Sequence, residues 1–224
     1  MKQVEGGGRL VWALCVSSLV SVLLYVISSH YYGAEPFWFL NWNLVLAWLP
    51  LIFAIMLVRH LKDNPWISGM GALLTLLWLT FLPNSFYLIT DLIHLGFADS
   101  TQKLYYVIMF FSFSFNGLIL GYISLYLLHQ ELLKRLKPRT AHVCIGVTLL
   151  LCSFAIYLGR YLRWSTWDII LHPIGVVFDV SDRIINPVAY GQTFQVTALF
   201  FILLGSMYFT LWHLVAAVRG YKPR

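Results

Sequence analysis

Residues 66–95 read WISGMGALLTLLWLTFLPNSFYLITDLIHL and contain both a membrane-length apolar run and its interruption. The first part, residues 66–82, has no charged side chain and falls within the about 17 to 25 residues that a helix needs to cross a bilayer. Pro83 then removes a backbone donor, and Asp91 and His94 follow among apolar residues. The stretch therefore predicts a membrane helix that kinks or ends at Pro83, with a polar segment beyond it.

The composition of the whole chain agrees with a membrane environment. Hydrophobic residues make up 60% of the sequence, charged residues 11%, and the mean hydropathy is +0.77. A water-soluble domain normally carries about 25% charged residues. Short strands of alternating apolar and polar residues, which are typical of a membrane β-barrel, do not occur in the sequence. These features indicate an integral membrane protein built from helices.

Six apolar runs are long enough to span a bilayer, and we predict one all-α polytopic domain over residues 1–224. Lys2 and Arg9 precede the first run as in a signal peptide, but its apolar stretch exceeds the usual length of about 7 to 15 residues, so we expect a retained helix. The predicted spans are residues 10–27, 40–58, 66–82, 104–128, 141–158 and 194–218.

The orientation follows from the Lys and Arg residues, because cytoplasmic loops retain positive charge. If the N-terminus lies inside, eleven of the fifteen Lys and Arg residues fall on the inner side and four on the outer side. We therefore predict that both termini are cytoplasmic. The outer four are Lys103, Arg160, Arg163 and Arg183.

A net charge of +6 can indicate nucleic-acid binding, but here the positive residues are spread over the predicted inner loop ends. The densest run, KRLKPR at Lys134–Arg139, is interpreted as a topology determinant that can also touch anionic lipid head groups. The bilayer is thus the expected partner, and nucleic acid is excluded.

The first polar cluster lies in the predicted outer loop after Pro83. Asn84, Tyr87, Asp91 and His94 are spaced 3, 4 and 3 residues apart, which places them on one side of an α-helix. Asn84 or Ser85 is the expected N-cap of this amphipathic segment. It carries no Lys or Arg, so we expect its polar stripe to face protein.

The second polar cluster is GRYLRWSTWD at residues 159–168. Arg160 and Arg163 are three residues apart, and Arg160, Trp164 and Asp168 follow at intervals of four, so a helical extension would carry them on neighbouring faces. Arginines on the outer side are unusual, because positive residues normally stay on the cytoplasmic side. Their presence suggests a carboxylate partner such as Asp91 or Asp168, or an anionic ligand. We predict that the two polar clusters meet at the outer end of the bundle.

A third segment, GVVFDVSDRIINP at residues 175–187, predicts a second amphipathic helix on the outer surface. Its expected apolar stripe faces away from the polar side chains. The stripe consists of Val177, Val180, Ile184 and Val188, and the polar side of Asp179, Asp182, Arg183 and Asn186.

The motifs LPNSFYLITDLIHL and LGRYLRWSTWD, at these positions in a six-helix chain, resemble the bacterial membrane-protein family known as domain of unknown function 1361. Members of that family often have Ala-Pro where this chain has Ser85-Phe86. The resemblance covers nearly the whole chain and implies a multi-pass protein of the bacterial cytoplasmic membrane. It implies no activity, and the cofactors stay unknown.

Three functions fit the polar residues. In an enzyme acting on a lipid-linked or envelope anionic substrate, His94 would be the acid or base and Asp91 would orient it. Asn84, Tyr87, Arg160, Arg163 and Asp168 would bind the substrate. In a transporter or binding subunit, the same groups would form an anion site. In a structural or assembly protein, they would form a clasp between helices.

The remaining polar residues are assigned structural positions. Asn116, beside Gly117, Gly121 and Ser124, predicts close helix packing. His60, His129, His142 and His213 fall near predicted cytoplasmic helix ends and are interpreted as interfacial residues. A metal bound by Asp91 and His94 with His172 or Asp168 is disfavoured, because no H-E-x-x-H or H-x-x-x-H pair occurs.

Overall fold

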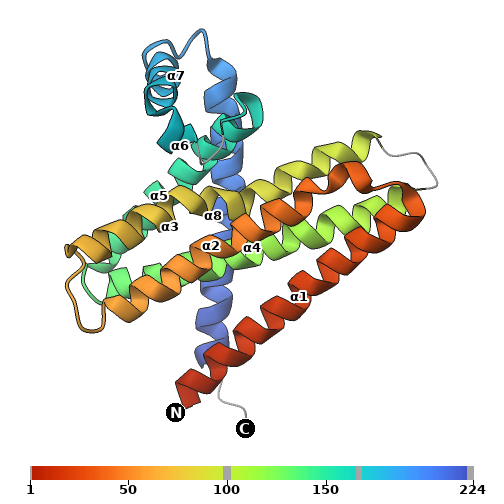
Figure 1. The fold of residues 1–224 in the computed structure, drawn as a ribbon. Coiled ribbons are helices and arrows are strands. Elements are labelled where there is room, and N and C mark those ends of the chain that lie inside the picture. The colour runs from red at the N-terminus through yellow and green to blue at the C-terminus, as the bar shows by residue number, and fades with distance from the viewer. Residues whose placement is uncertain (1, 98–101, 165–167, 221–224) are drawn as a thin grey trace. The chain divides into compact units, whose positions relative to one another are not determined.

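A computed structural model describes residues 2–97, 102–164 and 168–220, and these residues form helices and connecting turns with no strand among them. Six helices are long and apolar enough to cross a membrane, and each coincides with one of the predicted spans. They are α1 (Lys2–Tyr32), α2 (Phe39–His60), α3 (Gly69–Tyr87), α4 (Lys103–Leu133), α5 (Pro138–Tyr161) and α8 (Gly191–Gly220) (Figure 1). The shorter elements are the 3₁₀ helices η1 (Glu35–Phe37) and η2 (Leu88–Phe97) and the α-helices α6 (Asp168–Leu171) and α7 (Pro173–Ile185).

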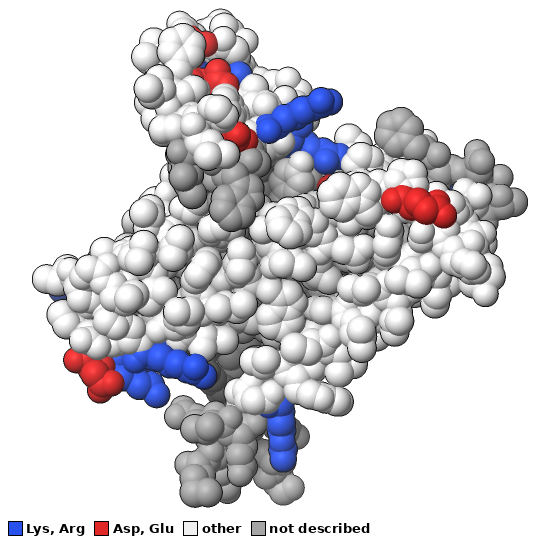
Figure 2. Space-filling view, viewed as in Figure 1, with Lys and Arg blue, Asp and Glu red and all other residues white. Residues whose placement is uncertain are grey.

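The surfaces of the long helices suit a lipid environment. The face shown in Figure 2 is largely free of charge, with Lys, Arg, Asp and Glu gathered in a few separate clusters. Large apolar side chains such as Trp12, Leu76 and Leu199 are more than half exposed on the spanning helices. An extended apolar surface of this kind is not tolerated in water, so the six helices indicate a multi-pass membrane protein.

The chain divides into two compact units, residues 1–124 and residues 125–224. The first contains α1 to α3 and most of α4, and the second contains the end of α4 and everything after it. Each unit is described by itself below, and the assignment of all 224 residues to one domain stays a prediction.

The first unit is centred on the packing of α2 against α3. The start of α3 is fixed by Ser68, whose Oγ accepts a hydrogen bond from the Gly71 backbone N–H at 3.1 Å. Trp66 Nε1 donates to Thr75 Oγ1 at 2.8 Å, and this bond secures the preceding turn against the helix. An N-cap of this type satisfies one of the four free amides at a helix start.

Pro83 lies inside α3, and the helix continues past it to Tyr87 before changing to the 3₁₀ helix η2. The prediction that a new helix starts with a cap at Asn84 or Ser85 is therefore wrong. Phe81, Leu82 and Phe86 are all buried, and a chain buried in apolar surroundings must keep its backbone hydrogen bonds. Continuing the helix meets that requirement, whereas ending it at Pro83 would leave buried carbonyl groups without partners.

Helix α4 approaches the end of α3 closely at two glycines. A Cβ atom placed on Gly117 would lie 2.4 Å from the Ser85 carbonyl oxygen, and one on Gly121 would lie 2.7 Å from the Phe86 ring. Neighbouring Asn116 donates from Nδ2 to Ser21 Oγ of α1 at 2.9 Å. This confirms the predicted small-residue packing of this part of α4.

The second unit is centred on α5 and α8, which pack along each other. Helix α5 ends at Tyr161, and Arg163 takes a left-handed conformation with φ of 59°. The Trp164 N–H then donates back to the Leu158 carbonyl at 3.3 Å. The prediction that α5 extends through Trp164 is therefore wrong, because the left-handed Arg163 ends the helix. The rest of the predicted extension, residues 165–167, lies outside the described residues.

The predicted amphipathic helix after His172 exists as α7, although it ends before Asn186 and Val188. Its place on the outer surface stays a prediction. Its apolar side is strongly exposed, with Ile174 at 84% and Phe178 at 71%. Its polar side is turned to the protein, where Arg183 is only 8% exposed. A surface helix of a soluble protein turns its apolar side to the protein and its polar side to water. The exposed apolar side of α7 is instead suited to contact with lipid at a membrane surface.

The close approach of α4 to α3 generates a stability prediction. We expect Gly117→Ala to lower the free energy of unfolding by about 1 to 3 kcal/mol, because the added methyl group has no room beside the Ser85 carbonyl. Thermal denaturation of the purified protein in detergent measures the effect. Gly146→Ala is the matched control: a Cβ there meets open space, so we expect stability to be unchanged or up to about 1 kcal/mol higher. Equal effects of the two changes would contradict the close approach.

Candidate functional site

Asp91 is almost completely buried in the first unit, with 1% of its surface exposed. Asn43 of α2 donates from Nδ2 to Asp91 Oδ2 at 3.1 Å. A buried carboxylate is costly unless it is hydrogen-bonded or paired. Asp91 therefore joins η2 to α2 through an interaction that spans 48 residues of sequence.

His94 lies one 3₁₀ turn beyond Asp91, so the two residues lie on the same side of η2. Its imidazole is half-buried among three aromatic rings. The ring centroids of Phe37, Phe39 and Phe110 lie 6.1, 5.3 and 6.2 Å from that of His94. These contacts come from η1, α2 and α4, so His94 packs where three elements meet.

Asn84 and Tyr87 belong to the last turn of α3 rather than to η2. Asn84 Nδ2 donates to the Phe81 carbonyl at 3.1 Å, and the Tyr87 carbonyl accepts from Thr90 Oγ1 at 2.7 Å. The predicted single α-helical stripe through Asn84, Tyr87, Asp91 and His94 is therefore wrong, because the helical period changes from about 3.6 to about 3.0 residues per turn after Tyr87.

Two buried hydroxyl groups secure the junction of α3 and η2. Ser85 Oγ donates to the Ala47 carbonyl of α2 at 2.8 Å, and Ser114 Oγ of α4 donates to the Leu88 carbonyl at 2.9 Å. The bond from Ser114 supplies a partner to a backbone carbonyl at the junction, and the bond from Ser85 ties the last turn of α3 to α2. Together with the Asn43–Asp91 bond, these contacts hold η2 between α2 and α4.

The remaining predicted site residues belong to the second unit. Arg160 is half-buried in the last turn of α5, Arg163 is exposed in the left-handed turn, and Asp168 begins α6. Their predicted meeting with Asp91 and His94 would join the two units, and it stays a prediction. The sequence predicted that Trp164 lies on the same helical face as Arg160. Its indole instead contacts α7, where Trp164 Nε1 donates to Asp179 Oδ2 at 2.7 Å.

Asp182 of α7 is a second carboxylate with defined partners. Tyr190 donates from its hydroxyl to Asp182 Oδ2 at 2.5 Å, and Asn186 Nδ2 donates to Oδ1 at 2.8 Å. These bonds, that of Tyr190 foremost, hold the pKa of Asp182 below its ordinary value near 3.8. The same bond raises the pKa of Tyr190.

A pH dependence follows for α7. Because the pKa of Asp182 is depressed, its stabilising bonds are complete above the ordinary carboxyl pKa and are lost as the pH falls through the lowered value. We expect hydrogen exchange of α7, corrected for its intrinsic pH dependence, to accelerate only below about pH 4. Tyr190→Phe removes the main cause of the shift, so we expect the acceleration to begin at higher pH in that variant. Identical profiles for the two proteins would contradict the Tyr190–Asp182 bond.

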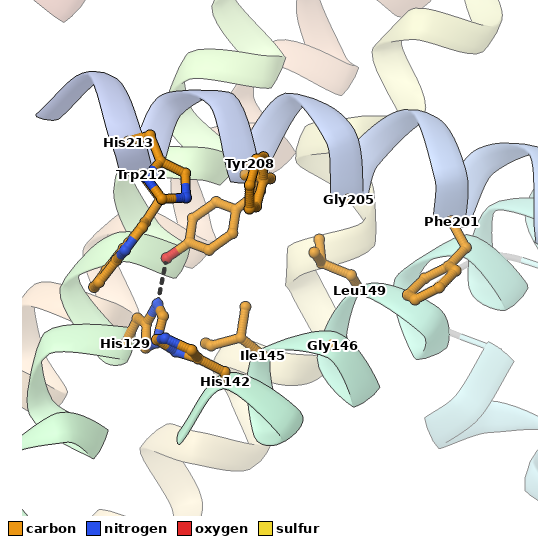
Figure 3. A pocket seen from close by; sticks show the side chains of 11 residues that line it. His129, His142, Ile145, Gly146, Leu149, Phe201, Gly205, Tyr208, Trp212 and His213 are labelled. Atoms are coloured by element: carbon orange, nitrogen blue, oxygen red, sulfur yellow. Dashed lines mark hydrogen bonds between the residues drawn. The ribbon is translucent and has the colours of Figure 1, made fainter. Parts of the chain in front are cut away.

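The second unit also contains a cavity of about 390 Å³ that sequence reasoning missed. One end is polar: His129 Nδ1 and the Tyr208 hydroxyl lie 2.8 Å apart, and His129 Nε2 and His142 Nδ1 also lie 2.8 Å apart. The Trp212 ring stacks on His129 with centroids 4.3 Å apart (Figure 3). The rest of the lining is mostly apolar and includes Leu149 and Phe201.

The residues at this polar end come from α4, α5 and α8. Because these helices are far apart in the sequence, no local motif predicted that the residues meet. His129 and His142 were interpreted as interfacial residues, and neither has a metal-type spacing to another histidine. Within the described ranges, no group of three or more His, Cys, Asp or Glu residues is arranged to hold a metal ion. The available signal was weaker: His142 precedes Gly146 by about one turn, and Tyr208, Trp212 and His213 follow Gly205 within about two turns.

The fold and the two polar clusters define a multi-pass helical membrane protein with polar groups inside each compact unit. The family model described as "Protein of unknown function (DUF1361)" matches residues 42–212, so the chain belongs to this family. Searches of curated proteins and of solved structures found no match.

Proposed function

We propose that the protein is a structural or assembly protein of the bacterial cytoplasmic membrane, with both termini in the cytoplasm, and that its Asp91 cluster is a clasp between helices. The observation that supports this best is the burial of Asp91, at 1% exposure, with a hydrogen bond from Asn43 of α2. A reacting carboxylate needs access to its substrate, whereas a clasp needs its polar groups paired and sealed.

The surroundings of Asp91 support the same function. Ser85, Asp91 and Ser114 each bond to a neighbouring helix, and the His94 ring packs among aromatic side chains. Each contact fixes the position of η2 relative to α2 or α4. We infer that the clasp sets the geometry of the outer end of the first unit, where a membrane partner would bind.

Deep transport through the first unit is not favoured. Asn116 is the main polar side chain placed deep in α4, and its amide donates to Ser21 Oγ and to the Ser112 carbonyl. These are bonds between and within packed helices. A transporter would instead carry polar groups onward from such a residue toward the other membrane face.

An enzyme or anion-binding protein of the outer face is the second candidate. The observation that favours it is the left-handed turn at Arg163, a conformation that costs a residue other than glycine about 1 kcal/mol or more. The turn holds an exposed guanidinium three residues after Arg160. In this proposal His94 is the acid or base, Asp91 orients it, and Asn84, Tyr87, Arg160, Arg163 and Asp168 bind a lipid-linked or envelope anion.

Substitutions at Asp91 test the clasp. We expect Asp91→Asn to keep near-normal thermal stability in detergent, because an amide oxygen can still accept from Asn43. Asp91→Ala should lose about 1 to 3 kcal/mol, since it leaves the half-buried Asn43 amide without this acceptor. Asn43→Ala should lose a similar amount, and the combined change should be less than additive. Additive losses, or wild-type stability of Asp91→Ala, would contradict the clasp.

A cellular experiment separates the two candidates. Envelope lipids and glycans are compared between a deletion strain and strains producing wild-type protein, His94→Ala or Arg163→Ala at equal levels. The clasp predicts that both variants restore the wild-type composition wherever the protein folds, because Arg163 lies outside the clasp and the clasp uses His94 for packing and not for proton transfer. If both variants resemble the deletion strain although the proteins are folded, the enzyme is favoured.

A further inference from the structure

We infer that the cavity lined by α5, α8 and the end of α4 binds an amphiphile with an acidic oxygen head group and a single apolar tail. The site lies entirely within residues 125–224 and shares no residue with the Asp91 clasp. Its volume of about 390 Å³ is at the lower end of the range for small-molecule sites.

The polar end consists of a chain of three hydrogen-bonding groups. If Tyr208 donates to His129 Nδ1, then His129 Nε2–H donates to His142 Nδ1. His142 Nε2 then carries a proton and can donate it to a group outside these three residues. If all bonds reverse, His142 Nε2 becomes an acceptor. His142 is exposed, so in either arrangement it can bind a head group that both accepts and donates. A carboxyl group or a phosphate monoester can do both.

The charges around the polar end favour an acidic head. His129, His142 and His213 all line the cavity, and no Asp or Glu is among its lining residues. The basic residues Lys137 and Arg139 are exposed at the start of α5, immediately before His142. The nearby carboxylate of Glu131 is already paired, with Lys134 and Arg135 each 2.5 Å away. No lining carboxylate therefore opposes an anion at this end, and Lys137 and Arg139 begin the helix that carries His142.

The orientation of the cavity matches that of a lipid in one leaflet. His142 and His213 lie near the ends of α5 and α8, where charged residues cluster, while Leu149 and Phe201 lie further along the same helices. At about 1.5 Å per residue, Leu149 is about 10 Å from His142 and Phe201 about 18 Å from His213 along the helix axes. Half of the hydrocarbon core is about 15 Å thick, so a tail can extend inward while its head stays at the interface.

The proposed path of the tail passes between two glycines on facing helices, Gly146 of α5 and Gly205 of α8 (Figure 3). A Cβ atom on either glycine would meet nothing within 4 Å. The space beside them is therefore open, and the walls around it, including Ile145 and Leu149, are buried apolar side chains. A volume this small holds one chain and not two, which selects a single-tailed amphiphile over a two-chain phospholipid.

The test is equilibrium binding of tritiated oleate to the purified full-length protein in a neutral detergent at pH 8. Lysophosphatidic acid and monoolein serve as competitors with a phosphate head and a neutral head on the same tail. We expect oleate or lysophosphatidic acid to compete at least about 10-fold better than monoolein. The better of the two acids identifies the head group as a carboxylate or a phosphate.

Three variants locate the site. Gly205→Leu fills the tail path without contacting other atoms at its Cβ, and we expect it to weaken oleate binding at least about 10-fold. Ser206→Leu adds similar bulk at the next, exposed position of α8 outside the cavity, and it should bind like the wild type. His142→Ala should weaken the acids and leave monoolein unchanged. Size-exclusion profiles and melting temperatures confirm that each variant is folded.

Several results overturn the proposal. These are no saturable binding of either acid, equal competition by monoolein, or wild-type binding by folded Gly205→Leu protein. Equal losses in Gly205→Leu and Ser206→Leu also overturn it, since they would place the tail outside the cavity. Stability of the Asp91 clasp is measured separately and is not changed by any of these results.

Discussion

The close approach of Gly117 to the Ser85 carbonyl is the contact on which the first unit depends. It brings α4 directly against the last turn of α3, at the point where the α-helix changes to the 3₁₀ helix η2. From there the Ser114 hydroxyl donates to the Leu88 carbonyl, a backbone group at the start of η2. In an apolar solvent such a change of helix type is possible only where neighbouring helices supply these bonds. The position of Asp91 beside Asn43 is a consequence of where that change occurs.

The two units use polar groups in different ways. In the first unit, short hydroxyl and amide side chains bond to backbone carbonyls or to one buried carboxylate, and these contacts hold elements together. In the second unit, three long side chains bond to one another at the end of a cavity. Bonds from side chains to the backbone hold helices in place. A series of hydrogen-bonded side chains that ends beside open space can instead form a further hydrogen bond with a ligand. This difference separates the clasp of the first unit from the proposed amphiphile site of the second.

Composition and apolar run length were sufficient to predict the helical class and the six spans. The bilayer requires spanning segments to be apolar, and its thickness determines how long they must be. Local geometry was less predictable. Burial of Phe81 and Phe86 carries α3 past Pro83, and the left-handed Arg163 ends α5 before Trp164; both outcomes depend on tertiary contacts that residue spacing does not contain. The Asn43–Asp91 bond and the His129–His142–Tyr208 chain also join distant segments. Candidate residues such as Asp91 could be chosen for their rarity in an apolar chain, but their partners could not.

The open space beside Gly146 and Gly205 bears on what the cavity holds. A Cβ atom at either position would meet nothing within 4 Å, so larger side chains could occupy part of this space. Glycine at both positions keeps the space open. Apolar side chains that face such a space lack the dispersion contacts that a packed neighbour would supply. An apolar tail between the two helices would supply these contacts, while its head group would bind at the exposed His142.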